Sequence, residues 1–164
     1  MGFVPVPGRS LATDHANEIE HLMQQYGNDI LRVCFLYLRD VALAEDATQE
    51  TFLKAYKSMD GFRRDSSEKS WLMRIAINTC KDMRRGTWFR IIDRHTPLEK
   101  LPEPTCTFEP QDVTLTTEVM RLPAKYKDVT ILRYYQNMQL GEIAKALGIP
   151  EGTVSTRLKR ARAM

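Results

Sequence analysis

The C-terminal segment 139–164 contains the clearest concentration of side chains able to bind nucleic acid. Its sequence is QLGEIAKALGIPEGTVSTRLKRARAM, in which hydroxyl and cationic side chains recur along the second half. These side chains share the outward face of a predicted helix: Thr153, Ser155, Thr156, Arg157, Lys159, Arg160 and Arg162. Hydroxyls and cations on one exposed helical face can bond to phosphate oxygens and base edges. The spacing therefore indicates DNA binding rather than catalysis.

Two short amphipathic helices joined by a tight turn would hold that face in place. The apolar positions that bury the inner sides of the two helices are Ile143, Ala144, Leu147, Val154 and Leu158. Gly148 can adopt the left-handed conformation that ends a helix, and Pro150 suits the first turn of the next helix. This combination predicts a helix-turn-helix. The alternative is a solvated basic helix, because Lys and Arg near a C-terminus also favour the helix dipole.

A second cationic surface falls on a helix that we expect to start near Ser70, its N-cap. Its apolar stripe is Leu72, Ile75, Ala76, Thr79 and Met83, and its opposite stripe is Arg74, Asn78, Lys81 and Arg85. Cations for phosphates beside Trp71 for stacking would suit single-stranded nucleic acid. Periodicity alone favours the plainer interpretation, in which Trp71 belongs to the core and the stripe is solvated.

Motifs of catalytic, cofactor or metal chemistry do not occur in the sequence. There is no P-loop, dinucleotide-binding glycine motif, zinc-protease motif or nucleophile elbow. The histidines His15, His21 and His95 are isolated, and the cysteines Cys34, Cys80 and Cys106 lie far apart without a CxxC pair. Buried or incidental thiols are the expected interpretation. We predict no enzyme, no catalytic residue, no cofactor and no metal.

Composition limits the partners and the location. The 164 residues carry a net charge of +3, with 43% hydrophobic and 27% charged residues. Nucleic-acid affinity would therefore come from local clusters of charge, not from a global basic field. No apolar run approaches the about 20 residues that cross a bilayer, and MGFVPVPGRS lacks a signal peptide's apolar stretch. We expect a cytoplasmic protein without membrane insertion.

Helical periodicity dominates the first half of the chain, and no β pattern of any length appears. One helix is expected from about Asp14 to Arg39, interrupted at Gly27, and another from about Ala42 to Met59. The polar residues of the second helix cluster in its first half: Glu45, Asp46, Gln49 and Glu50. Without a partner constellation these residues indicate a recognition face or a solvated face. The segment 61–70 that follows is polar and is expected to be a loop.

Proline density marks a linker after this helical region. Pro97, Pro102, Pro104 and Pro110 accumulate where periodicity fades, although 87–92 is apolar enough to dock on something. We predict an all-α fold of two small helical domains joined by a proline-rich linker. The expected divisions are a flexible N-terminus over 1–13, a first domain over 14–86, a linker over 87–111 and a second domain over 112–164.

Four ordered motifs resemble those of extracytoplasmic-function sigma factors, the minimal two-domain class of bacterial sigma factor. EDATQETFLKAY over 45–56 resembles the signature of sigma region 2, and Phe62-Arg63 with WLMRIA over 71–76 and Asn78 resembles the segment that follows it. LPAKY over 122–126 resembles the start of region 4, with Lys127 in place of the usual Arg. EGTV over 151–154, with Arg157 and 160–162, resembles its recognition helix. The resemblance covers about 19–164.

The resemblance implies site residues for three tasks. It assigns polymerase binding, at the β′ clamp coiled coil, to Asp46, Gln49, Glu50 and the apolar anchor Phe52. Capture of a flipped base of the minus-ten element and its strand falls to Arg63, Arg64, Asp65, Ser66, Trp71, Arg74, Asn78, Lys81 and Arg85. Recognition of the minus-thirty-five duplex falls to Thr153, Ser155, Thr156, Arg157, Lys159 and Arg160. Many relatives have Lys or Arg at the position of Ser155.

The implied function is promoter selection by a subunit of RNA polymerase. The implied partners are core polymerase, through the β′ clamp and the β flap, promoter DNA and an anti-sigma factor, in a stress or envelope response. Two alternatives stay open at this point. One is a helix-turn-helix regulator with a sensing or dimerising domain, and the other is a truncated sigma-like decoy that binds polymerase without initiating.

Overall fold

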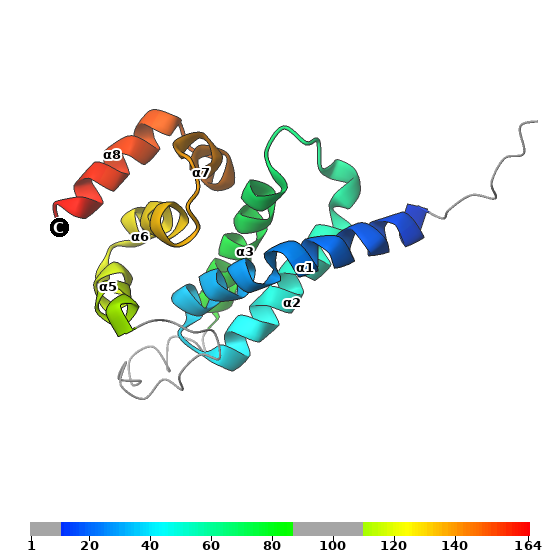
Figure 1. Cartoon of the computed structure of the whole chain (residues 1–164), viewed down its shortest axis with the longest axis horizontal. Coiled ribbons are helices and arrows are strands. Elements are labelled where there is room, and N and C mark those ends of the chain that lie inside the picture. Colours follow the sequence, from blue (N-terminus) through cyan, green and yellow to red (C-terminus); the bar gives the residue numbers. More distant parts are fainter. Residues whose placement is uncertain (1–10, 87–109) are drawn as a thin grey trace, which may run out of the picture.

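The computed structural model describes residues 11–86 and 110–164, and every regular element in these two ranges is a helix (Figure 1). The elements are α1 (Leu11–Leu38), α2 (Val41–Lys57), the short 3-10 helix η1 (Met59–Gly61), α3 (Glu68–Arg85), α5 (Pro110–Arg121), α6 (Ala124–Thr130), the π-helical turn η3 (Ile131–Tyr135), α7 (Leu140–Leu147) and α8 (Glu151–Arg162). The predicted all-α fold is confirmed.

The predicted domain divisions remain a prediction, although two of the helices begin earlier than expected. α1 begins at Leu11 and α5 at Pro110, within segments predicted as flexible terminus and linker. The remainder of those segments lies outside the described residues, as do the apolar stretch 87–92, His95 and Cys106. In the described ranges, no helix is both long and apolar enough to cross a membrane.

The first domain is a bundle in which α1, α2 and α3 pack against one another. α1 continues through Gly27, so the predicted interruption is wrong. A helical glycine costs about 1 kcal/mol relative to alanine. Burial of Leu22 and Ile30 on either side of the glycine offsets this cost, because both side chains are almost fully removed from water.

The start of α3 also differs from the prediction. Ser67, not Ser70, is the N-cap, since its Oγ accepts a bond from the Ser70 backbone N–H at 3.1 Å. Ser70 itself is buried one turn inside the helix. The buried surface of α3 is wider than the predicted stripe and includes Met73, Ile77 and Cys80. A helix buried on more than one side needs more than one packing partner.

The second domain contains the predicted helix-turn-helix, formed by α7 and α8. Gly148 has φ 65° and ends α7 in the left-handed conformation, as expected. Val154 and Leu158 are buried on the inner side of α8. Pro150 is the N-cap of α8 and not a residue of its first turn. On α7, Ala146 is more deeply buried than Ala144.

The two domains lie against each other, with α7 packed on α3 and α5 beside α1 (Figure 1). Buried apolar side chains from both domains belong to one continuous cluster. This packing gives α3 the additional partner that its wide buried surface requires. The sequence predicted two bundles on a tether, and nothing in its periodicity indicated that they would touch.

Candidate polymerase and nucleic-acid interfaces

An acidic and amide surface lies on the outer side of α2. The side chains of Asp46, Gln49 and Glu50 are exposed there. Asp40 is the N-cap of the helix, and its carboxylate accepts the Leu43 N–H at 2.8 Å. Burial of Ala44, Ala47, Thr51 and Ala55 turns the opposite side inward. The pattern of exposed carboxylates and amide therefore follows directly from how α2 packs.

Phe52, expected as the apolar anchor of this surface, belongs to the core instead. Its side chain is 4% exposed, whereas the neighbouring Leu53 is 47% exposed. Leu53 follows Gln49 by four residues and Glu50 by three, so it shares their face of the helix. Tyr56, one turn further, is also exposed and meets the ring of His15 edge-on. Leu53 and Tyr56 are the apolar groups available to a partner.

The loop between η1 and α3 carries the residues expected to capture a base. Arg63, Arg64 and Asp65 are exposed, and Ser66 is half-buried. Arg64 has φ 54°, a left-handed conformation that turns the chain sharply, and its guanidinium lies 3.9 Å from the Glu18 carboxylate. A short loop with exposed polar side chains and one tight turn can form a rim around a small ligand.

Trp71 anchors this loop to α3. Its ring stacks on Phe62, with centroids 4.5 Å apart and an angle of 24° between the planes. The tryptophan is half-buried, so it packs within the protein and still has an accessible part. Packing within the protein was the plainer of the two interpretations drawn from periodicity.

The cationic stripe of α3 has mixed exposure. Arg74, Asn78 and Arg85 are exposed, as a nucleic-acid surface requires. Lys81 is only partly exposed, because its Nζ lies 2.6 Å from Oδ2 of Asp128 on α6. One member of the predicted DNA-binding stripe is therefore already paired with the other domain.

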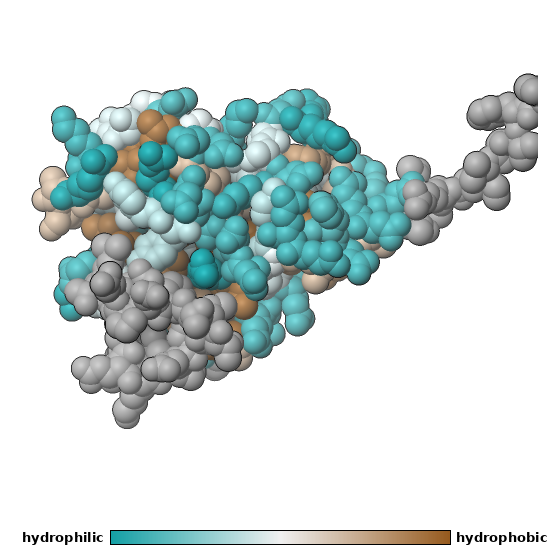
Figure 2. Space-filling model, in the orientation of Figure 1, coloured by the Kyte–Doolittle hydropathy of each residue, from teal (hydrophilic) through white to brown (hydrophobic). Residues whose placement is uncertain are grey.

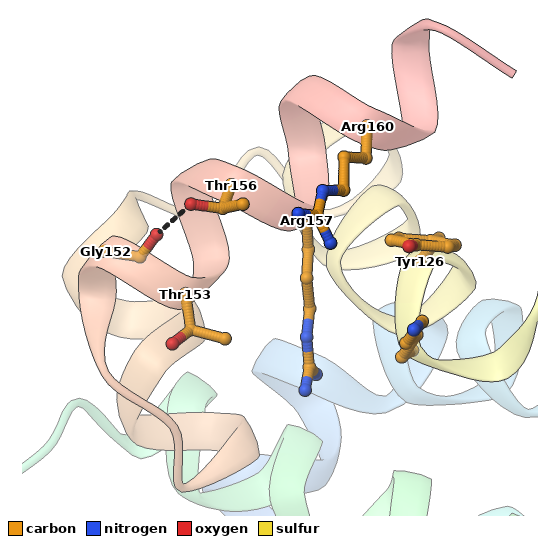
Figure 3. A pocket seen from close by; sticks show the side chains of 7 residues that line it. Tyr126, Gly152, Thr153, Thr156, Arg157 and Arg160 are labelled. Carbon is orange, nitrogen blue, oxygen red and sulfur yellow. Dashed lines mark hydrogen bonds between the residues drawn. The ribbon is translucent and has the colours of Figure 1, made fainter.

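The outer face of α8 has the side chains predicted for it. Ser155, Thr156, Lys159 and Arg160 are exposed, while Thr153 and Arg157 are half-buried. Thr156 donates its hydroxyl to the Gly152 carbonyl at 2.9 Å, which fixes its rotamer (Figure 3).

A shallow hollow between α6 and α8 extends this surface beyond the recognition helix. It is lined by Lys125, Tyr126, Gly152, Thr153, Thr156, Arg157 and Arg160 (Figure 3). The Arg160 guanidinium beside the Tyr126 hydroxyl, together with the charge of Lys125, lowers the pKa of that phenol below its usual value. Lys125 Nζ also lies 5.0 Å from the ring centroid of Tyr126. Three cations and several hydroxyls around one hollow can hold a phosphate.

Lys125 and Tyr126 were absent from the residues predicted to bind DNA. Their only signal in the sequence was their position in the LPAKY motif. Periodicity could not find them, because they lie at the start of a different helix and meet α8 only through the fold.

No group of three or more His, Cys, Asp or Glu side chains that could hold a metal ion occurs among the described residues. Cys34 and Cys80 are free and buried, which confirms the expected interpretation of these two thiols.

Two family models match the chain over the regions that carry these surfaces. Sigma-70 region 2 matches residues 22–90 and Sigma-70 region 4 matches residues 113–164. The chain belongs to the extracytoplasmic-function sigma factors of the sigma-70 family. A helix-turn-helix regulator would share only the second match. In this sigma factor, α2, α3 and most of α1 lie in region 2, and α6, α7 and α8 lie in region 4.

Curated relatives agree with that membership, and solved structures share the fold. The sigma factor is 32% identical over 151 residues to the ECF RNA polymerase sigma factor SigW of Bacillus subtilis, covering 84% of this chain and 81% of SigW. It is 33% identical to the RNA polymerase sigma factor YlaC of the same species, over 90% of each chain. The fold resembles CnrH in complex with the cytosolic domain of CnrY, with a TM-score of 0.69 at 22% identity over 93% of this chain and 90% of that one. It also resembles RpoE in complex with the anti-sigma factor NepR from Bartonella quintana, with a TM-score of 0.68 at 22% identity over 89% and 92%.

The pairing of Tyr126 with Arg160 gives a prediction that depends on pH. A neighbouring cation favours the phenolate, so the Arg160→Ala variant should titrate Tyr126 at a higher pH than the parent does. The measurement is an NMR titration of tyrosines labelled at the ring carbon that bears the hydroxyl. Lys159→Ala removes an equal charge from an exposed neighbour and should change the Tyr126 pKa less. An Arg160→Ala variant with an unchanged Tyr126 pKa would contradict the pairing.

Proposed function

We propose that this sigma factor binds core RNA polymerase through the exposed side of α2 and directs it to promoters by two separate DNA-reading surfaces. The observation that supports this proposal most directly is that one chain has an acidic surface on region 2 and a cationic recognition helix on region 4. Sigma factors are transcription initiation factors without enzymatic activity of their own. Core polymerase would catalyse RNA synthesis, and this subunit would determine where on the DNA it starts.

The polymerase contact is built on charge and hydrogen bonding around an apolar centre. Asp46, Gln49 and Glu50 would meet basic and polar groups of the β′ clamp coiled coil, and Leu53 and Tyr56 would supply apolar contact. Complementary charge sets the orientation and speeds the encounter, while the apolar side chains contribute burial.

A second polymerase contact fits an apolar groove on region 4. The groove runs between α5, η3 and the end of α8, and the side chains that give it its apolar character include Val119, Leu122, Pro123, Tyr134 and Met164. Tyr134 and Met164 are large exposed side chains on a surface otherwise rich in charge. An apolar groove of this kind accepts the apolar face of a helix, and we assign the β flap to it.

Promoter recognition would be divided between the domains. The loop over 62–67 and the stripe Arg74, Asn78, Lys81 and Arg85 would capture a flipped base and hold the single strand of the minus-ten element, with Trp71 supporting the loop. Unstacking a base costs least where the duplex is already melting, so reading and opening occur together. Ser155, Thr156, Lys159, Arg160 and the hollow beside Tyr126 would bind the minus-thirty-five duplex.

Control by an anti-sigma factor is part of the proposal. The RpoE structure that shares this fold contains an anti-sigma factor. A partner of that kind could occupy the polymerase-binding surfaces of α2 and the region 4 groove, so that sequestration and polymerase binding would exclude each other.

Transcription from genomic DNA of the host, with core polymerase and this protein, tests the function across every promoter in the genome at once. The proposal predicts that sequenced transcript 5′ ends share two upstream motifs at a fixed separation. A decoy would bind polymerase and give no specific 5′ ends. A duplex regulator would bind specific sites without polymerase and leave the 5′ ends unchanged, and either result would contradict the proposal.

The α2 interface can be tested separately from DNA. Replacement of Asp46, Gln49 and Glu50 by Ala should weaken binding to core polymerase about tenfold or more, because three exposed polar contacts are lost without disturbing the core. Affinity would be measured by biolayer interferometry with immobilised core enzyme. A control variant with Glu20, Gln24 and Asp82 replaced by Ala removes the same number of carboxylates and amides from other exposed sites of region 2. Equal affinity of the two variants would refute the assigned interface.

A further inference from the structure

The recognition helix α8 has two adjacent shallow hollows on its outer side. One lies between α8 and α6, and Lys125 and Tyr126 of α6 belong to its lining. The other is lined by Ser155, Thr156, Lys159, Arg160 and Ala163. Arg160 lines both hollows, so the direction of its side chain decides in which of the two its charge lies.

Tyr126 fixes that direction toward α6. The Arg160 guanidinium is directed at the Tyr126 hydroxyl (Figure 3). A hydrogen bond between these two groups is the main reason why the pKa of the phenol lies below its usual value. The phenol oxygen is the acceptor in this bond, because a guanidinium has donors only. The bond therefore directs the charge of Arg160 into the hollow between α6 and α8.

This hollow gathers positive charge without a carboxylate to balance it. Lys125 Nζ lies 5.0 Å from the ring centroid of Tyr126, so the aromatic ring holds a second cation near Arg160. Arg157 lines the same hollow, and none of the described residues that line it is an Asp or a Glu. A group of cations beside hydroxyls in a shallow hollow suits one phosphate of a nucleic-acid backbone.

The other side of the outer face suits bases better than phosphates. Ser155 and Lys159 are exposed and lie four residues apart, so they share one side of α8. The Lys159 ammonium group has donors only, and guanine presents two acceptors in the major groove. Thr156 donates its proton to the Gly152 carbonyl at 2.9 Å, which leaves its oxygen as an acceptor for the amino group of adenine or cytosine.

We propose that Tyr126 is a positioning residue that directs Arg160 to a backbone phosphate of the minus-thirty-five duplex, so that base recognition depends on Lys159 and not on Arg160. The inference rests on the proposed function, because it takes α8 as the helix that lies in the major groove. Arginine is the side chain that most often recognises guanine. Its removal from the base-reading side therefore changes which sequences α8 prefers.

Five single substitutions separate a phosphate contact from a base contact. Arg160→Ala removes the cation assigned to phosphate, and Lys159→Ala removes the cation assigned to a base. Tyr126→Phe removes only the hydroxyl that directs Arg160 and keeps every charge. Lys57→Ala is the control for net charge, because Lys57 is an exposed cation of α2 that lines neither hollow. Tyr26→Phe is the control for loss of a hydroxyl, since Tyr26 is a half-buried tyrosine of α1.

Two readouts on the full chain, without polymerase, test the proposal. The first is the affinity for a short fluorescein-labelled duplex of random sequence, measured by fluorescence anisotropy over a series of salt concentrations. The slope of log affinity against log salt concentration reports the number of phosphates contacted. The second is the base preference at each position, obtained by sequencing the duplexes that the protein selects from a random library. Circular dichroism checks that each variant keeps its helix content.

Arg160→Ala should reduce the magnitude of the salt slope by about 0.9, the contribution of one phosphate, and should keep the base preferences of the parent. Lys159→Ala should keep most of the slope and lose the preference at one base pair. Tyr126→Phe should bind random duplexes about threefold more weakly, because the guanidinium is no longer held in place, and should select guanine at an additional position. Lys57→Ala and Tyr26→Phe should match the parent in both readouts.

Four results would overturn the proposal. They are the loss of a base preference in Arg160→Ala, an unchanged salt slope in that variant, a Tyr126→Phe variant that matches the parent in both readouts, and a parent protein that does not bind the duplex at any salt concentration. An equal fall of the slope in Lys57→Ala would show an effect of net charge and would also overturn it.

Neither readout uses polymerase or a promoter. A transcription experiment that gives no specific 5′ ends would reject the proposed function without changing the salt slopes or the selected sequences. A failure of the proposed function is therefore distinguishable from a failure of the roles assigned to Tyr126 and Arg160.

Discussion

The buried carboxylate of Asp128 constrains the arrangement of the whole molecule. A charge removed from water is tolerated only when it is paired and hydrogen-bonded, and here both partners, Tyr37 on α1 and Lys81 on α3, come from the other domain. α6 must therefore lie against α1 and α3, and the rest of region 4 follows: α7 packs on α3, and α8 packs on α6 and α7 (Figure 1). The apolar cluster that continues through both domains fixes the same arrangement.

In this arrangement the three proposed binding surfaces differ in how much of each is exposed to solvent. The acidic side of α2 and the cationic side of α8 are open to solvent, and polar groups cover much of the molecule around them (Figure 2). The loop before α3 and the stripe of α3 are partly occupied by region 4. Arg74, Asn78 and Arg85 of the stripe nevertheless stay exposed.

Local features were predictable from the sequence because their causes are local. Apolar spacing located the helices, and a glycine followed by a proline located the turn between α7 and α8. The failures have equally physical causes. Gly27 stays helical because packing on both sides outweighs its propensity, and Ser67 caps α3 where Ser70 was expected to do so. Phe52 was taken for an exposed anchor because the family motif names it, but the helix turns it into the core and exposes Leu53. Asp128 has no signal at all, since its partner Tyr37 lies 91 residues away.

The account depends most on the claim that one chain carries a polymerase-binding surface on α2 and promoter-reading surfaces on α3 and α8. The direct measurement is the sequencing of transcript 5′ ends made from genomic DNA of the host by core polymerase, with either the parent protein or the variant in which Asp46, Gln49 and Glu50 are replaced by Ala. The account predicts 5′ ends with two shared upstream motifs at a fixed separation for the parent, and far fewer such ends for the variant. Equal numbers of these ends with both proteins would contradict the assignment of α2, and the absence of specific 5′ ends with the parent would contradict the function.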